Sequence, residues 1–121
     1  MNKITILIPV YNEYNTLNKI LTKIENIDFY GLNKEIILID DCSIDGTKEL
    51  YKDLNYKVLY HEKNLGKGAA LRDGFKEATG DIVTIQDADL EYNPEDLLPL
   101  VKVVMDNEAD VAYGSRFMNI D

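Results

Sequence analysis

Two aspartates separated by a single residue, Asp87 and Asp89, are the side chains of this sequence best suited to chemistry. They directly follow an apolar run typical of a buried strand, and Glu91 stands two residues further on. Carboxylates this close repel each other by about 3 kcal/mol per pair at an effective dielectric constant near 20, and a divalent cation relieves that repulsion. Oxygen ligands without histidine favour Mg²⁺ or Mn²⁺, completed by substrate phosphate oxygens and water. The pattern therefore predicts a metal site that also takes a phosphate group.

Further acidic residues follow other strand-like runs. Glu13 comes after the first run, and Asp40, Asp41 and Asp45 come after the second. The carboxyl ends of parallel strands share one edge of a sheet, so these residues are expected to converge there with the aspartate pair. Asp45 precedes a glycine, and we expect it to start a turn and cap a helix instead of joining a site.

Composition excludes several other kinds of chemistry. The chain has 121 residues and a formal net charge of −9, from 13 basic and 22 acidic residues, so contact with nucleic-acid phosphates would be repulsive. Its single cysteine, Cys42, cannot form an internal disulfide, and its single histidine, His61, cannot build a site of several His or Cys ligands. We expect His61 to be a solvated loop residue. The chemistry must then be done with carboxylates.

Two motif matches fail on inspection. The segment 41–46 imitates the start of an EF-hand loop, but the twelfth position is Lys52 where a bidentate glutamate is required. The pair Gly66 and Lys67 suggests a phosphate loop, yet the first glycine of that motif is replaced by His61. Neither a calcium loop nor a Walker loop is predicted.

Alternating strands and helices must position these residues. The apolar runs indicate strands at 4–9, 35–40, 56–60, 81–86 and 110–114, the inner ones nearly continuous as in a parallel sheet. Helical spacing or caps predict helices at 17–27, 47–54 and 68–79 and another beginning after Asn93, with Asn15 or Thr16 capping the first. Gly80 is expected to end the third helix in a left-handed conformation. The fold class is α/β, a Rossmann-like, mostly parallel sheet with helices on both faces.

The length fits one domain, residues 1–121, because a chain of this size builds a single core. No apolar run approaches the roughly 20 residues that span a bilayer, and the first residues lead directly into a strand-like run. We expect a cytoplasmic protein, with peripheral contact at the cytoplasmic membrane face as the other setting.

Ordered motifs along the chain resemble those of the family-2 glycosyltransferases, most closely the dolichol-phosphate or polyprenyl-phosphate mannose and glucose synthases. The motifs run in register and occupy residues 8–13, 39–47, 64–72, 86–90 and 114–116. The resemblance implies a GT-A fold, a GDP- or UDP-linked sugar as donor, a Mg²⁺ or Mn²⁺ ion, and inversion at the anomeric carbon. It also implies that residues 1–121 are the N-terminal, nucleotide-sugar-binding part of such a domain.

The resemblance also implies roles for individual residues. Asp87 and Asp89 form the D-x-D pair, with Asp89 as the main metal ligand and Glu91 as a further candidate ligand, while Arg116 reaches a phosphate. Asp41 accepts a hydrogen bond from the base. The nucleotide-sugar pocket is lined by Pro9, Tyr11, Glu13, Ile39, Asp41, Asp87 and Ala88.

The resemblance implies a polyprenyl (dolichyl) phosphate or another acceptor. A lipid phosphate is already an anion and needs no general base. A sugar hydroxyl would need one, and no residue stands out for that role. Two alternatives remain: a module that binds nucleotide sugars without transfer, and a nucleotidyltransferase. Uncovered apolar surface beside the site leads us to expect a homo-oligomer.

Overall fold

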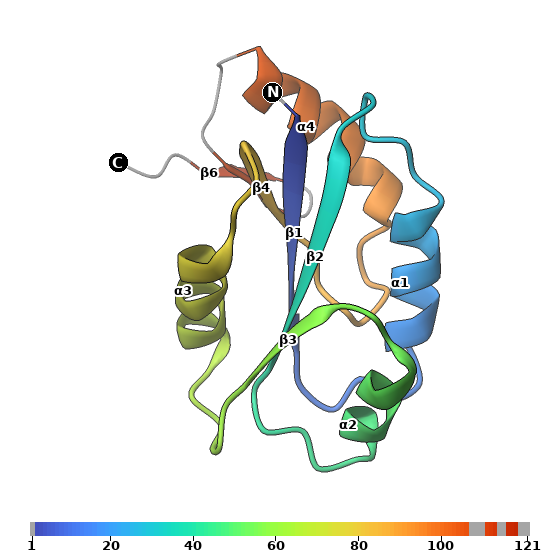
Figure 1. Cartoon of the computed structure of the whole chain (residues 1–121), viewed down its shortest axis with the longest axis vertical. Coiled ribbons are helices and arrows are strands. Elements are labelled where there is room, and N and C mark those ends of the chain that lie inside the picture. Colours follow the sequence, from blue (N-terminus) through green and yellow to red (C-terminus); the bar gives the residue numbers. More distant parts are fainter. Residues whose placement is uncertain (1, 107–110, 114–115, 119–121) are drawn as a thin grey trace.

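A six-stranded sheet forms the centre of the computed structural model, which describes residues 2–106, 111–113 and 116–118, the last two segments by backbone alone. The strand order is β3-β2-β1-β4-β5-β6, and every neighbouring pair is parallel except β5 and β6 (Figure 1). The strands are β1 (Lys3–Val10), β2 (Asn33–Asp40), β3 (Lys57–Tyr60), β4 (Ile82–Ile85), β5 (Val111–Tyr113) and β6 (Arg116–Met118).

Helices follow the strands in the predicted order. They are α1 (Leu17–Glu25), α2 (Thr47–Leu50), η1 (Tyr51–Asp53), α3 (Lys67–Glu77), η2 (Pro94–Asp96) and α4 (Leu97–Met105), where η marks a 3₁₀ turn. Asn93 caps η2 as expected, because its Oδ1 accepts the N–H of Glu95 at 3.0 Å. None of the helices in the described part of the chain is long and apolar enough to cross a bilayer.

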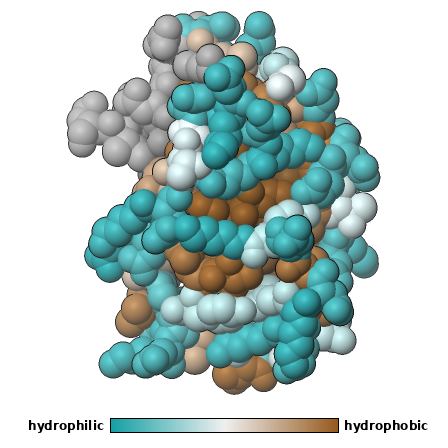
Figure 2. Space-filling view, viewed as in Figure 1, coloured by the Kyte–Doolittle hydropathy of each residue, from teal (hydrophilic) through white to brown (hydrophobic). Residues whose placement is uncertain are grey.

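The helices cover both faces of the sheet, which confirms the predicted α/β architecture. Figure 1 shows α1 and α4 on one side of the sheet and α3 on the other. Each face of the sheet has its own hydrophobic core, and side chains that alternate along β1 contribute to both. Ile4, Ile6 and Ile8 pack with α1 and α4, while Leu7 packs on the side of α3. Figure 2 shows hydrophobic residues in the middle of the molecule, bordered by hydrophilic ones.

The end of α3 and the last strand differ from what the sequence predicts. Gly80 does not end α3 in a left-handed conformation, since the helix ends at Glu77 and Gly80 is not among the residues with positive φ. Gly80 is needed for close packing instead: a Cβ there would lie 2.6 Å from the backbone nitrogen of Thr5. Strand β6 was not predicted at all, because a three-residue antiparallel strand carries no recognisable pattern.

Candidate active site

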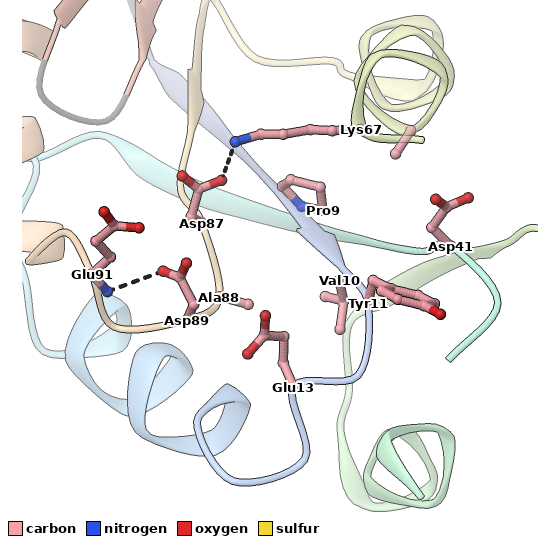
Figure 3. A pocket seen from close by; sticks show the side chains of 11 residues that line it. Pro9, Val10, Tyr11, Glu13, Asp41, Lys67, Asp87, Ala88, Asp89 and Glu91 are labelled. Atoms are coloured by element: carbon pink, nitrogen blue, oxygen red, sulfur yellow. Dashed lines mark hydrogen bonds and ion pairs between the residues drawn. The ribbon is translucent and has the colours of Figure 1, made fainter. Parts of the chain in front are cut away.

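A pocket lies at the carboxyl ends of β1, β2 and β4, where the sequence predicted that acidic residues converge. Figure 3 shows the side chains that line it, which come from the end of β1, from the loops after β1, β2 and β4, and from the start of α3. The lining residues are Pro9, Val10, Tyr11, Glu13, Asp41, Lys67, Ala70, Asp87, Ala88, Asp89 and Glu91. The structure therefore brings together residues up to about 80 positions apart in the chain.

Most of the predicted site residues line this pocket, but Ile39 does not. Ile39 is fully buried in the core beneath α3, where its Cδ1 lies 2.9 Å from the position that a Cβ on Gly74 would take. The side chain of Arg116 lies outside the described residues, although its backbone begins β6. The roles of both residues stay predictions.

The loops after β1 and β2 are tied to each other. The N–H of Asn12 donates to Ser43 Oγ at 2.9 Å, and Asn12 Oδ1 accepts the N–H of Ile44 at 2.8 Å. Asp45 also accepts from both loops, from the N–H of Tyr14 at 3.2 Å and from the N–H of Thr47 at 3.0 Å. Asp45 thus holds the turn before α2, as expected, but the N-cap position of α2 is taken by Gly46. The tied loops fix one wall of the pocket.

The adjacent aspartates after β2 have different environments. Asp40 is fully buried, and its carboxylate accepts the Tyr51 hydroxyl at 2.6 Å and the Ser43 N–H at 3.0 Å. Burial raises the pKa of Tyr51 far above its ordinary value, and the bond to Asp40 raises it further. Asp40 therefore supports the loop from beneath, and Asp41 is the one of the two that faces the pocket.

Asp41 is held by the loop before α3. Its carboxylate accepts the N–H groups of Leu65 and Gly66, each at 2.8 Å, and contacts Nδ1 of His61 at 2.8 Å. Burial by itself would raise the pKa of Asp41, but these hydrogen bonds outweigh it and hold the pKa below its ordinary value of 3.8. Asp41 is therefore an ionised acceptor at neutral pH.

The expectation of a solvated His61 was wrong. The residue is 8% exposed, because its ring is enclosed between Asp41 and Asp73 of α3. Both partners are distant in sequence, so the surroundings of His61 in the chain did not indicate burial.

The turn that carries the aspartate pair is fixed by its own hydrogen bonds. Gln86 is fully buried, and its Nε2 donates to the carbonyl groups of Asp87 at 3.1 Å and Tyr92 at 2.9 Å. Asp89 Oδ1 accepts the N–H of Glu91 at 3.0 Å, and Thr16 Oγ1 lies 2.5 Å from the carbonyl oxygen of Ala88. The turn is therefore anchored to β4 and to the start of α1.

Lys67 is a pocket residue that the sequence analysis missed. Its ammonium group forms an ion pair with Asp87, across the pocket from Asp89 (Figure 3). The Gly66–Lys67 pair does not belong to a Walker loop, because His61 stands at the position of the motif's first glycine. The position of Lys67 at the first residue of a helix next to the site was the indication available in the sequence.

The acidic residues give the pocket a strongly negative character. Burial raises the pKa of Glu13, and the charges of Asp89, Asp45 and Asp87 raise it further against a hydrogen bond from Thr16. A bound cation would relieve this repulsion. Hard carboxylate oxygens suit Mg²⁺ or Mn²⁺, which commonly use one or two carboxylates and leave other positions to water and phosphate.

The geometry limits how many protein ligands a cation would have. No three Asp, Glu, His or Cys side chains among the described residues are grouped so that they could hold a metal ion. The predicted set of Asp87, Asp89 and Glu91 is thus not assembled as a ready three-carboxylate site. The donor chemistry fits a cation held by one or two of these carboxylates and completed by ligand oxygens.

Solved structures similar to this chain are glycosyltransferases. A glucosyl-3-phosphoglycerate synthase from Mycobacterium tuberculosis, in complex with Mn²⁺, UDP and glucosyl-3-phosphoglycerate, matches with a TM-score of 0.69 and 28% identity over 85% of this chain and 39% of that one. A mannosyltransferase from Pyrobaculum calidifontis, in complex with GDP-Man and Mn²⁺, matches with a TM-score of 0.63 and 29% identity over 84% of this chain and 31% of that one. The Rossmann-like GT-A fold is confirmed by these neighbours.

Curated relatives have the same character. A dolichol-phosphate mannosyltransferase of Pyrococcus furiosus is 38% identical over 120 residues, 96% of this chain and 34% of the relative. An undecaprenyl-phosphate 4-deoxy-4-formamido-L-arabinose transferase of Aeromonas hydrophila is 38% identical over 109 residues, 84% of this chain and 33% of the relative. The chain thus spans about a third of the length of these relatives. The sequence model of Glycosyl transferase family 2 matches residues 5–121, and the chain belongs to this family.

Proposed function

We propose that this chain binds a GDP- or UDP-linked hexose as the donor part of a metal-dependent, inverting glycosyltransferase that acts on a polyprenyl (dolichyl) phosphate or another acceptor. The observation that carries the proposal is the pocket in which Asp41 and the Asp87–Asp89 turn lie opposite each other in a family-2 chain. The named activities of the relatives support a polyprenyl-phosphate acceptor, and the complexes of the neighbours support both donor types.

The nucleoside belongs at the end of the pocket formed by Pro9, Tyr11 and Asp41. A carboxylate at Asp41 accepts from N3 of uracil or N1 of guanine, whereas the pairing edge of adenine offers it no donor except the amino group. Asp41 Oδ2 accepts the backbone N–H of Gly66, and a carboxylate oxygen has capacity for a second donor. GDP and UDP are therefore expected to bind more tightly than ADP. Ile39 would support this end from the core, and Ala88 would contact the donor through its backbone.

The diphosphate belongs at the opposite end. Asp87 and Asp89, with Glu91 as a further candidate, would hold Mg²⁺ or Mn²⁺, and Lys67 and Arg116 would contact phosphate oxygens. The metal, when bound, supplies charge stabilisation to the departing nucleoside diphosphate. Glu13 lies on the same wall as Asp89, and its raised pKa would return toward the ordinary value when a cation reduces the negative charge there.

The transfer step needs an acceptor oxygen that attacks the anomeric carbon from the face opposite the nucleotide. A lipid phosphate is already ionised and can attack without a general base. This chain covers about a third of the relatives, so the acceptor belongs to the proposal for the whole protein. Self-association remains a further expectation, which size-exclusion chromatography tests.

The deciding experiment measures what the chain does to its donor. Calorimetry with a panel of GDP-, UDP- and ADP-sugars in Mn²⁺ should show binding of one GDP- or UDP-sugar. Incubation of that donor with polyprenyl phosphate should release nucleoside diphosphate and form glycolipid if transfer occurs. Release of pyrophosphate from a nucleoside triphosphate and a sugar phosphate would indicate a nucleotidyltransferase. Donor binding without any product, when the whole protein is assayed, would indicate a binding module. Absence of nucleotide binding would overturn the donor site.

A further inference from the structure

His61 joins the loop after β2 to helix α3 through two carboxylates. Its Nδ1 lies 2.8 Å from Asp41 Oδ1, and its Nε2 lies 2.7 Å from Asp73 Oδ2. The side chains of His61 and Asp41 are each 7% exposed, whereas that of Asp73 is 37% exposed. The ring therefore connects a pocket carboxylate to one at the surface.

Two carboxylates, one at each ring nitrogen, favour the charged form of the ring. A neutral imidazole has one N–H, so it would turn the lone pair of its other nitrogen toward a carboxylate oxygen, whereas an imidazolium donates from both nitrogens. The hydrogen bond to Asp41 raises the pKa of His61 most, burial opposes it, and Asp73 adds to the rise. Glu62 and Lys63, next to His61 in the chain, are exposed.

The same contacts order the pocket side of Asp41. Oδ1 is shared by His61 and the N–H of Leu65, and Oδ2 accepts the N–H of Gly66. Loss of the proton from His61 would remove a charged donor from one of the two carboxylates it joins. Asp41 and the turn that leads into α3 would then lose one of the hydrogen bonds that fix their positions.

We propose that His61 is a positioning residue for the nucleoside end of the donor: as an imidazolium between Asp41 and Asp73, it fixes the Asp41 carboxylate for the base. The inference rests on the proposed function, in which Asp41 accepts from the base. Nucleotide affinity is then complete below pH 6.5, the ordinary pKa of histidine, and decreases as the pH rises through the raised pKa of His61.

The single histidine of the chain allows this charge to be observed directly. Long-range ¹H–¹⁵N spectra should show both ring nitrogens protonated at pH 6.5 and a titration at higher pH. Calorimetry with UDP and GDP in Mg²⁺ should show the dissociation constant rising about tenfold across the same titration, the effect of one lost charged hydrogen bond. A His61 ring that is neutral at pH 6.5 would overturn the proposal.

Variants separate positioning from simple structural support. Asp73→Asn removes a charge outside the pocket, so the midpoints of the spectral titration and of the affinity curve should move to lower pH together. Glu77→Gln on the same helix removes a surface ion pair with Lys57 and should move neither midpoint. In His61→Gln the affinity should be weaker than in the wild type at pH 6.5 and should keep only the pH dependence that the nucleotide's own phosphate contributes.

The outcomes distinguish this inference from the proposed function. Nucleotide binding whose affinity does not change through the titration of His61 would overturn the role of His61 and leave the donor site in place. Retention of the wild-type pH dependence by His61→Gln would do the same. Failure of the wild-type chain to bind UDP or GDP at any pH would overturn both.

Discussion

The two aspartates of the predicted metal pair differ in their partners and in their exposure to solvent. Asp87 forms an ion pair with Lys67, and its side chain is 18% exposed, whereas Asp89 is exposed and accepts the N–H of Glu91. A cation that binds Asp87 must compete with an ammonium group, whereas at the exposed Asp89 it meets a carboxylate that accepts a neutral backbone N–H. Asp89 is therefore the residue on which metal affinity should depend most.

Asp89→Asn should remove the metal dependence of nucleotide binding. The variant keeps the size of the side chain and an acceptor for the Glu91 N–H but loses the charge, so nucleoside diphosphate affinity in Mn²⁺ should fall about 10- to 100-fold. Calorimetry with Mn²⁺ and with excess chelator measures this. Asp53→Asn, an exposed aspartate of η1 outside the pocket, should leave both affinities unchanged. Equal affinity of the wild type with metal and with chelator would contradict the role of the pair.

Some of these residues could be predicted from the sequence because their role depends on local context. Asp87 and Asp89 follow a recognisable buried strand, and Asp41 follows another, so the parallel sheet alone places them together. His61 and Lys67 depend on partners 12 to 20 positions away, to which they are joined only by the folded chain. A single sequence does not show which residues contact each other in the folded chain, so these pairs could not be predicted.

At the scale of elements, the packing of the turn after α3 against β1 should be sensitive to a single methyl group. Gly80→Ala would place Cβ 2.6 Å from the nitrogen and Oγ1 of Thr5 and 2.9 Å from the carbonyl oxygen of Ile82. Two of these atoms belong to backbone within the sheet and cannot move without strain, so unfolding by urea should show a loss of about 1–3 kcal/mol.

Gly68→Ala is the matched control for this substitution. Gly68 lies in α3 with no atom within 4 Å of the added Cβ, so alanine should raise stability by about 0.5–1 kcal/mol through a smaller entropy loss on folding. Equal stability of the two alanine variants would show that the turn after α3 relaxes without cost.

Secondary structure was predictable where a pattern ran for several residues. The stripe of α1 and the apolar runs of β1, β2 and β4 are long enough to show their period, and each was confirmed. The end of α3 was not, because Gly80 satisfies either a left-handed cap or a close approach, and only the position of Thr5 decides between them. The contact between Gly80 and Thr5 forms only in the folded chain, so the sequence could not show which of the two roles Gly80 has.

At the scale of the whole molecule, ionisable groups should confine maximal stability to mildly acidic pH. Hydrogen bonds from the N–H groups of Asn2 and Lys3 lower the pKa of Asp81, and those to Asp41 outweigh its burial, so both contribute stability above their ordinary pKa of 3.8 that is lost as the pH falls. His61 has the opposite sign: its raised pKa contributes stability below 6.5 that is lost as the pH rises.

Glu13 adds to the loss on the alkaline side. Its pKa is raised by burial and by neighbouring carboxylates, so its stabilising contribution is complete below its ordinary value of 4.5 and disappears as it ionises. The free energy of unfolding, measured with urea from pH 3 to pH 9, should therefore be greatest between 4.5 and 6.5, the ordinary values of glutamate and histidine. In His61→Gln the free energy of unfolding should decrease less steeply above pH 6.5 than in the wild type. In Glu13→Gln it should decrease less steeply just above pH 4.5. A wild-type stability that increases steadily from pH 6 to pH 8 would show that neither group is perturbed in the folded chain as described.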